Sequence, residues 1–407
     1  MRILMVAGEY PPMKGGISRY SVNLVNALAK KIQIDVATSY ASGRIQENAN
    51  PCTYLHESPK TYPIIAKGDR KNSDRLLNLI AELKPDVVHV QYERGLYEID
   101  TPYQMIYGRL FGSTLDKFLK TSKTPVVSTV HTLYPYNEYR DYIRQRASRK
   151  AGRLRILPLK VRVALRTTIM EQRYRLLLHV VGLSSEIISP SKTIRDIVGR
   201  GVVIFHGAEP AGYDDLSNEK KNDLRKEFGL PADKKVLLAF GYAGFYKGFE
   251  LLEGIRLPAG WTLVVKQDRH ERGAEQPVKI KDAINLNIGY IDDRALTNLF
   301  LSCDAIIFPY QVVSISGVMF DALAHGLPFV ASDLKFFREF AEMGLGILAT
   351  RNEISFSNAL ETLSQNYVQY RQRVLEFRTN LSWDIIADSH IKLYSTIIEQ
   401  NRQNSVM

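Results

Sequence analysis

Two stretches of the chain share one order: an apolar run, a loop with closely spaced glycines, and a helical pattern. In the first, the apolar run at 3–7 precedes the loop that holds Gly15 and Gly16, and helical spacing begins at Tyr20. In the second, the apolar run at 236–240 precedes the loop from Gly241 to Gly248, and a helix is expected over 249–255. A helix that follows such a loop offers unpaired backbone N–H groups and a partial positive charge to an anion such as phosphate. The repetition predicts two nucleotide-binding domains that face each other across a cleft.

Apolar runs alternate with helical patterns along both halves of the chain. Strands are expected at 32–38, 85–91, 125–130, 202–205, 261–265, 285–288, 305–308 and 328–331, and helices at 75–83, 293–301, 318–324 and 382–400. This alternation is typical of α/β proteins whose parallel sheets are covered by helices on both faces. A length of 407 residues also suits two domains. Since residues 208–235 are polar, we expect a first domain over 1–207, a second over 208–385 and a separate terminal helix over 386–407.

The composition excludes several classes of protein. The two cysteines, Cys52 and Cys303, have no metal-ligand spacing and fit a reducing compartment. No signal peptide is visible, and no apolar stretch approaches the roughly 18 residues of a membrane span. We therefore expect a cytoplasmic protein, with contact to the inner face of the membrane as an option.

The net charge of +11 is concentrated in residues 140–175, where twelve Lys and Arg residues stand against Asp141 and Glu171. Apolar side chains are interleaved with them, among them Ile143, Leu159 and Leu165. A basic and apolar segment suits an anionic membrane surface. The alternatives are a solvated helix packed on its own domain and a nucleic-acid contact, although no nucleic-acid module is recognisable.

The motifs at the predicted strand ends resemble those of retaining glycosyltransferases with the GT-B fold, in particular family 4. In the first half the matching stretches are Glu9 to Arg19, Pro85 to His89, Val130-His131 and His206-Gly207. In the second half they are Gly241, Lys247-Gly248, Ile288-Gly289, Cys303-Asp304, Phe308-Pro309, Ser316 to Val318, Asp321 to Asp333, Glu339 and Ser382-Trp383. Each motif is short, but their joint order makes chance an inadequate explanation.

The resemblance implies two Rossmann-like domains, with a C-terminal helix that crosses back to the first. It implies transfer of a sugar from a nucleotide-sugar donor to a glycan or lipid-linked glycan acceptor, with retention of the anomeric configuration. His131 and Lys247 match the catalytic positions. The donor-binding positions fall on Gly15, Gly16, Gly241, Tyr242, Lys247, Ser316, Gly317, Val318 and Asp321. His89 is expected to be a core residue.

Charge develops on phosphate oxygens when a nucleoside diphosphate departs, so the site must supply fixed positive charge or N–H donors. Because the chain contains no Asp-x-Asp sequence, we expect lysine and helix N-termini to replace a metal cofactor. Tyr242 stands where the family usually has arginine, and Val313 where it has glutamate. Lys266 replaces a usual glycine, and we hypothesise that it supplies the charge that Tyr242 lacks.

Two alternatives follow from these departures. The first is a nucleotide-sugar-binding homologue without transferase activity, acting as a partner or regulatory subunit. The second is a GT-B epimerase that converts the donor without any acceptor, although its usual acidic pattern is not evident.

The acceptor is expected to bind to the first half of the chain, where tyrosines are frequent. They are Tyr92, Tyr97, Tyr103, Tyr107, Tyr134, Tyr136, Tyr139 and Tyr142. Aromatic rings stack on sugars, but for most of these side chains core packing is the better interpretation.

Overall fold

The computed structural model describes residues 1–13, 15–40, 59–99, 113–149, 158–209, 217–269, 276–287, 289 and 291–406, without the side chains of 147–149 and 404–406. Lys14, Cys52, Tyr103, Tyr107, Ile288 and part of the basic segment, 150–157, lie outside the described residues. The chain forms two compact units. Unit 1 comprises 1–133, 147–207 and 383–407, and unit 2 comprises 134–146 and 208–382. Residues 134–146, which we placed in the first domain, thus pack with the second unit.

Unit 1 contains a parallel sheet of the doubly wound type. Its strands are β1 (Arg2–Ala7), β2 (Gln33–Ser39), β3 (Lys60–Ile65), β4 (Val87–Tyr92), β5 (Val126–Val130), β6 (Glu186–Ser189) and β7 (Val202–Val203). They lie in the order β3-β2-β1-β4-β5-β6-β7. Strand order therefore reverses between β1 and β4, and such switch points are where doubly wound sheets bind ligands.

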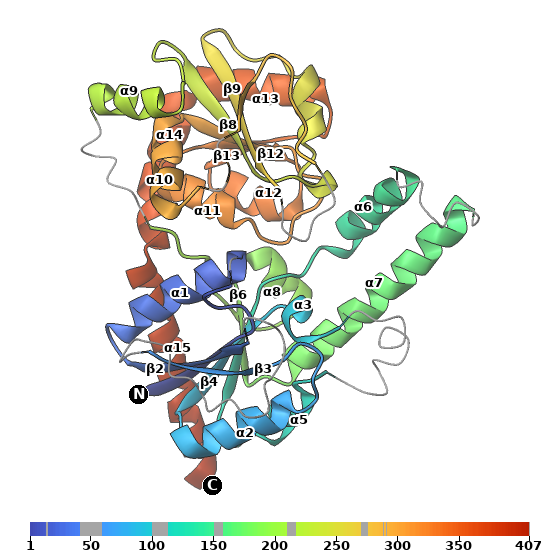
Figure 1. The fold of residues 1–407 in the computed structure, drawn as a ribbon, viewed down its shortest axis with the longest axis vertical. Coiled ribbons are helices and arrows are strands. Elements are labelled where there is room, and N and C mark those ends of the chain that lie inside the picture. Colours follow the sequence, from blue (N-terminus) through green and yellow to red (C-terminus); the bar gives the residue numbers. More distant parts are fainter. Residues whose placement is uncertain are drawn as a thin grey trace. The chain divides into compact units, whose positions relative to one another are not determined.

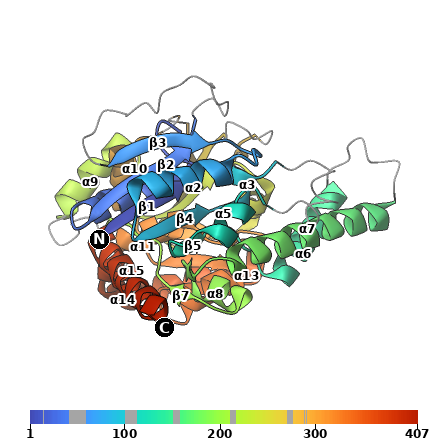
Figure 2. The same ribbon diagram turned by 90° about the horizontal axis from the view of Figure 1, so that it is seen from below.

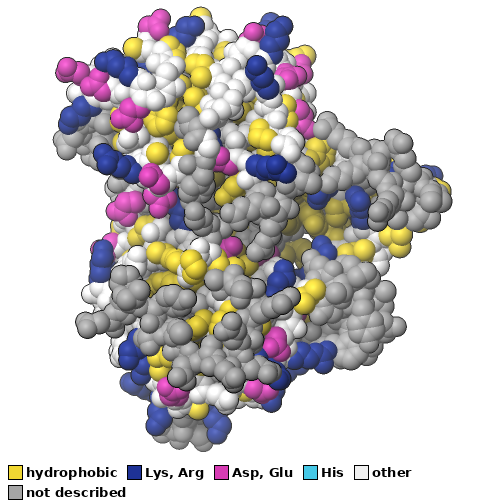
Figure 3. All heavy atoms as spheres, in the orientation of Figure 1, with side chains coloured by type: hydrophobic (Ala, Val, Ile, Leu, Met, Phe, Trp, Pro, Cys, Tyr) yellow, Lys and Arg dark blue, Asp and Glu magenta, His cyan; other side chains and the backbone are white. Residues whose placement is uncertain are grey.

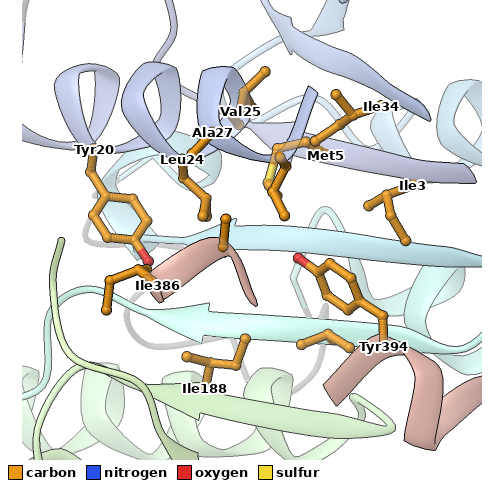
Figure 4. Packing of buried hydrophobic residues seen from close by; sticks show 14 of the residues in the cluster. Ile3, Met5, Tyr20, Leu24, Val25, Ala27, Ile34, Ile188, Ile386 and Tyr394 are labelled. Carbon is orange, nitrogen blue, oxygen red and sulfur yellow. The ribbon is translucent and has the colours of Figure 1, made fainter. Parts of the chain in front are cut away.

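Helices cover both faces of this sheet (Figure 1). They are α1 (Gly16–Ala29), α2 (Asn72–Leu83), α3 (Arg94–Tyr97), α5 (Asp116–Thr121), α7 (Leu159–Gly182), α8 (Lys192–Val198) and α15 (Trp383–Val406). On one face, Leu24 and Leu28 of α1 share an apolar cluster with Ile386 and Tyr394 of α15 and with Met5 of β1. The C-terminal helix is therefore part of the core of unit 1, as Figure 4 shows.

Unit 2 repeats the same strand plan. Its strands are β8 (Lys235–Tyr242), β9 (Trp261–Asp268), β10 (Ile284–Leu286), β11 (Ala305–Phe308), β12 (Phe329–Ser332) and β13 (Gly346–Ala349). They are parallel and lie in the order β10-β9-β8-β11-β12-β13. The switch point falls between β8 and β11, so the residues that follow these strands are the ones placed to bind a ligand.

The helical segments of unit 2 are more numerous than the sequence predicts. They are α6 (Tyr136–Arg149), α9 (Asn218–Glu227), η1 (Phe245–Lys247), η2 (Phe249–Gly254), α10 (Asp293–Ser302), α11 (Gly317–Ala324), α12 (Lys335–Ala341), α13 (Glu353–Gln365), α14 (Tyr367–Phe377) and η3 (Arg378–Leu381). The helix expected over 249–255 is a 3₁₀ segment instead, bounded by Gly248 in the left-handed region at φ +65° and by Gly254. An α-helix does not propagate between two glycines so close together.

Candidate functional site

The carboxyl ends of β1, β4 and β5 bring the predicted residues of unit 1 to one edge of its sheet. Gly15 and Gly16 follow β1, Gln91 lies near the end of β4, and His131 follows β5. The His131 N–H donates to the Tyr92 carbonyl at 3.1 Å, which holds the histidine beside the end of β4. We call these residues the first half-site, meaning a candidate ligand site within unit 1.

The N-terminus of α1 is packed on one side and open on the other. A Cβ added to Gly15 would lie 2.3 to 2.5 Å from the Glu9 carboxylate, whereas one added to Gly16 would meet no atom of the described residues within 4 Å. The Ser18 N–H donates to the same carboxylate at 3.1 Å. Gly15 is therefore needed for the packing of Glu9, and Gly16 is the position with room for a ligand.

His131 is buried and held through its Nε2 atom. That nitrogen lies 2.8 Å from the Oε1 atom of Gln91. Burial, and to a lesser extent the neighbouring His206, lowers the pKa of His131 to about 3. The imidazole is consequently neutral at physiological pH and acts as a hydrogen-bonding group, not as a cation.

The Tyr20 ring lies against His131 and against two further aromatic rings. The Tyr20 ring meets the His131 and His206 rings edge-on, with centroids 4.9 Å away in each case, and the Trp383 ring at 5.4 Å. Trp383 in turn covers Gly207, where an added Cβ would lie 2.4 Å from the indole. The motifs His206-Gly207 and Ser382-Trp383 are thus explained by close packing of the terminal helix behind the histidine.

The second half-site, in unit 2, is built around Lys247. Gly241, at the end of β8, has φ +144°, and a Cβ there would lie 3.2 Å from the Lys247 Cε atom. Glycine therefore allows the lysine side chain to lie against the strand end. The Lys247 ammonium sits 3.9 Å from the centroid of the Tyr310 ring and donates to the Tyr310 hydroxyl.

Lys247 is the most strongly perturbed cation of this half-site. It is 7% exposed, and burial lowers its pKa to about 7. Tyr310 also hydrogen-bonds Ser316, the N-cap of α11, whose hydroxyl accepts from the Met319 N–H at 3.3 Å. A chain of polar contacts therefore links the lysine to the beginning of α11.

The N-terminus of α11 points its first backbone N–H groups out of the helix. Gly317 and Val318 form the first turn, where N–H groups have no intrahelical acceptor. Asp321 lies one turn further on and is buried, as is Ser314 in the preceding loop. Val313, which replaces the family's glutamate, is buried and apolar. Lys247 therefore follows β8, while the N–H groups of Gly317 and Val318 and the Asp321 carboxylate belong to the helix that follows the neighbouring strand, β11.

Lys266 does not contribute free positive charge to this half-site. Its ammonium pairs with Asp268 and donates to the Gly289 carbonyl at 2.7 Å. The side chain is 1% exposed. Since its charge is compensated locally, we leave Lys266 out of the anion site, and Tyr242, which is 38% exposed at the end of β8, does not replace the family's arginine as a cation.

Other sequence motifs belong to the core. Asp304 binds Arg225 and Lys221, each at 2.7 Å, and so ties α9 to the sheet. His89 is fully buried, as predicted for a core residue, and Tyr92 and Tyr97 are buried as well. Among the tyrosines of the described residues, Tyr136 is exposed and Tyr134 and Tyr139 are half-buried.

Sequence reasoning missed three residues: Gln91, Tyr310 and Gln311. Gln91 is a polar residue within a predicted buried strand, and this is a signal that could identify it. Gln311 donates from Nε2 to the Phe245 carbonyl at 2.9 Å and so fixes the turn that presents Lys247. Their partners lie far away in the chain, and the sequence alone gives no spacing that would connect them.

Across the described residues, no helix is long and apolar enough to cross a membrane, and no group of three or more His, Cys, Asp or Glu side chains is arranged to hold a metal ion.

Comparison with known proteins settles the family. The model of Glycosyltransferase Family 4 matches residues 14–204, and that of Glycosyl transferases group 1 matches 260–366. The chain belongs to the family 4-like glycosyltransferases. An uncharacterized glycosyltransferase of Methanocaldococcus jannaschii is 22% identical, over 98% of this chain and 99% of the relative.

Solved structures show that this glycosyltransferase has the GT-B fold. Sucrose-phosphate synthase from Thermosynechococcus elongatus superposes with a TM-score of 0.65 and 15% identity, covering 98% of this chain and 100% of the other. Anabaena HepE, in complex with UDP, gives a TM-score of 0.60 and 14% identity, with 97% and 100% covered. The enzyme is therefore a glycosyltransferase in which the described half-sites lie at the strand ends where its fold binds ligands.

Proposed function

We propose that the enzyme is a retaining glycosyltransferase that binds the diphosphate of a nucleotide-sugar donor at Lys247 and the N-terminus of α11. The observation that supports this most directly is the buried Lys247 ammonium, held by Tyr310 beside the end of β8. A buried cation that lacks a carboxylate partner in its strand-end loop is costly unless an anion binds it. HepE, which shares the fold, has been solved with UDP-glucose, a donor of the proposed class.

The same residues suit the chemistry of sugar transfer. Breaking the bond between the anomeric carbon and the phosphate oxygen leaves negative charge on the departing diphosphate, while the acceptor hydroxyl bonds to the carbon and passes its proton to a departing phosphate oxygen. Lys247 and the N–H groups of Gly317 and Val318 stabilise that charge. We assign Asp321 to the nucleotide ribose, because a carboxylate accepts hydrogen bonds from paired hydroxyls. His131 contacts the reacting sugar as a neutral hydrogen-bonding group.

The proposal includes independence from metal ions, since protein cations and helix N-termini supply the charge. Turnover should be unchanged after exhaustive treatment with EDTA, and loss of activity that magnesium restores would refute this part.

For the acceptor we propose a glycan or lipid-linked glycan presented at an anionic bilayer. The first half of α7 exposes Leu159, Val161 and Leu165 between basic residues such as Lys160 and Arg166. None of its residues from Leu159 to Ile169 is buried, and the helix extends beyond the sheet of unit 1 in both ribbon views (Figures 1 and 2). Figure 3 shows Lys and Arg side chains beside hydrophobic ones in this region. Such a surface binds anionic headgroups and acyl chains together.

Two experiments test the proposal. Lys247→Ala should lower turnover by roughly two to three orders of magnitude, the effect of removing one strong electrostatic donor. Lys235→Ala is the matched control, because Lys235 lies over a tyrosine ring at the opposite end of the same strand, 4.1 Å from the Tyr367 centroid. Equal activity of the two variants would remove Lys247 from the site.

The second experiment tests the bilayer contact. The enzyme should co-sediment with liposomes that contain anionic lipids at low salt, and Leu165→Glu should weaken this binding. Absence of co-sedimentation would refute the bilayer contact.

The binding-only homologue stays the alternative because Tyr242 and Val313 replace two family residues. Slow donor hydrolysis without acceptor separates the two, since a protein that only binds the donor releases no nucleoside diphosphate.

A further inference from the structure

A line of hydrogen-bonded polar side chains crosses the core of unit 1 from His131 to the C-terminal helix. His131 Nε2 lies 2.8 Å from Gln91 Oε1, Gln91 Nε2 lies 3.3 Å from His89 Nε2, and His89 Nδ1 lies 2.6 Å from the Tyr394 hydroxyl. Gln91, His89 and Tyr394 are fully buried. Apolar side chains would pack in such a place without the desolvation that polar groups require, so a function for the line is expected.

Met5 fixes the orientation of the Gln91 amide. The Gln91 Nε2 atom lies 3.0 Å from the Met5 sulfur, which accepts hydrogen bonds but has no proton to donate. The nitrogen of the amide must therefore face Met5, and the oxygen must face His131. An amide oxygen only accepts, so His131 must carry its proton on Nε2. The Nδ1 atom of His131 is then left as the hydrogen-bond acceptor of the ring.

The orientation of Gln91 also determines the tautomer of His89. Its Nε2 atom faces the Gln91 N–H group and, at 2.7 Å, the Thr129 hydroxyl. Both can donate, so this nitrogen accepts and the proton lies on Nδ1, which donates to Tyr394. Burial, with His390 and His131 nearby, lowers the pKa of His89 well below its usual value, in agreement with a neutral ring. All three hydrogen bonds of the line thus run in one direction, and each polarises the next.

Tyr394 connects this line to a distant part of the sequence. It lies on α15 within the apolar cluster that contains Met5 and Ile3, and Figure 4 shows its hydroxyl directed into that cluster. His390, one turn earlier on α15, has its ring 5.5 Å from His89 and donates from Nδ1 to the Ile386 carbonyl at 2.7 Å. The terminal helix therefore contributes both packing and a specific polar contact behind the half-site.

We propose that Gln91 is a positioning residue that locks His131 in the Nε2–H tautomer, and that His89 and Tyr394 of α15 hold Gln91 in this role. His131 then presents Nδ1 as a fixed acceptor for a hydroxyl of the bound sugar. The part that concerns turnover rests on the proposed function, whereas the tautomer itself is a property of the protein without ligand.

The first test reads the tautomer directly. In full-length protein with ¹⁵N-labelled histidine, imidazole correlation spectra should show His131 protonated on Nε2 and His89 on Nδ1 from pH 6 to 8, with signals assigned by single substitutions. Gln91→Leu should give His131 a mixture of tautomers, and Tyr394→Phe should shift the His89 signals. Tyr92→Phe is the matched control, since it removes a fully buried hydroxyl of the same sheet that is outside the line. A His131 proton on Nδ1 in the wild type, or equal spectra for the two Tyr variants, would overturn the proposal.

The second test concerns catalysis. Gln91→Leu should lower kcat about tenfold, as for one lost hydrogen bond, while KM for the donor changes less than twofold. Gln91→Glu keeps the acceptor oxygen and should recover part of kcat. If Gln91→Leu fails to fold, the comparison of Tyr394→Phe with Tyr92→Phe still decides. If no donor is turned over by the wild type, the proposed function fails and the spectra alone decide on the tautomer. An unchanged kcat in an active Gln91→Leu variant would refute the positioning role.

Discussion

Binding of a nucleotide sugar should be coupled to protonation of Lys247. Since burial lowers the pKa of this lysine to about 7, it is mostly neutral at pH 8 in the free enzyme. A bound diphosphate beside it stabilises the charged form and raises its pKa again. At pH 8 about nine-tenths of the molecules would have to take up a proton on binding, and at pH 6 only about one-tenth.

The same argument fixes the change in affinity. Only the protonated lysine pairs with the diphosphate, so apparent affinity follows the protonated fraction of the free enzyme. That fraction falls about tenfold between pH 6 and pH 8, which corresponds to about 1.4 kcal/mol. Affinity should therefore be higher at pH 6, and the loss at high pH should come from Lys247 alone.

Isothermal titration calorimetry in buffers of different ionisation enthalpy measures the proton count. A nucleotide sugar such as UDP-glucose is the right ligand, because a free nucleoside diphosphate has a terminal phosphate that itself titrates near pH 6. Lys247→Met should abolish proton uptake and flatten the pH dependence, whereas the control Lys235→Ala should retain both. Equal proton uptake in wild type and Lys247→Met, or affinity that rises with pH, would refute the assignment.

Two further predictions concern pairs of residues beside the half-sites. Lys266→Met should lower the free energy of unfolding by about 3–5 kcal/mol, because Asp268 is left unpaired. The double variant Lys266→Met/Asp268→Leu should recover most of this stability and bind the nucleotide sugar with an affinity near that of the wild type. Denaturant unfolding and calorimetry measure the two quantities, and a large loss of affinity in the double variant would return Lys266 to the anion site. Gly207→Ala should destabilise unit 1 by about 1–3 kcal/mol, because the added methyl group clashes with the Trp383 ring. In a double-mutant cycle, Trp383→Leu should remove this penalty. Independent, additive effects of the two substitutions on the free energy of unfolding would contradict the packing argument.

The sequence was sufficient for the parts of the fold that local pattern decides. Apolar runs located most strands, because strands of a parallel sheet are buried on both faces. The strand β3 was not predicted: it lies at the edge of the sheet and contains Pro63, which a central strand would not tolerate. The Lys266–Asp268 pair could have been foreseen, since residues two apart on a strand point to the same side.

Other features depend on contacts between distant parts of the chain. Lys247 and Tyr310 are 63 positions apart, and His89 and Tyr394 are 305 apart. Their residue types carry no spacing signal, so only the strand order brings them together. The helix α6 shows the same limit, because Glu138 accepts from the Lys335 N–H at 2.7 Å and Tyr142 stacks on Phe245 with centroids 5.9 Å apart. These contacts place residues 134–146 with unit 2, against their position in the sequence.

The two half-sites differ in how they respond to pH, and this difference makes a last prediction. The pKa of His131, lowered to about 3, leaves the imidazole neutral throughout the range from pH 5 to 9, so it should add no limb to the profile of kcat/KM. Lys247 should add one descending limb with an apparent pKa of about 7, because the free enzyme loses the required cation above that pH. In Lys247→Arg, whose guanidinium stays charged, the remaining activity should show no such limb. Initial rates at subsaturating donor measure the profile. A descending limb that persists in Lys247→Arg would mean that another group titrates, and that the buried lysine is not the cation on which donor binding depends.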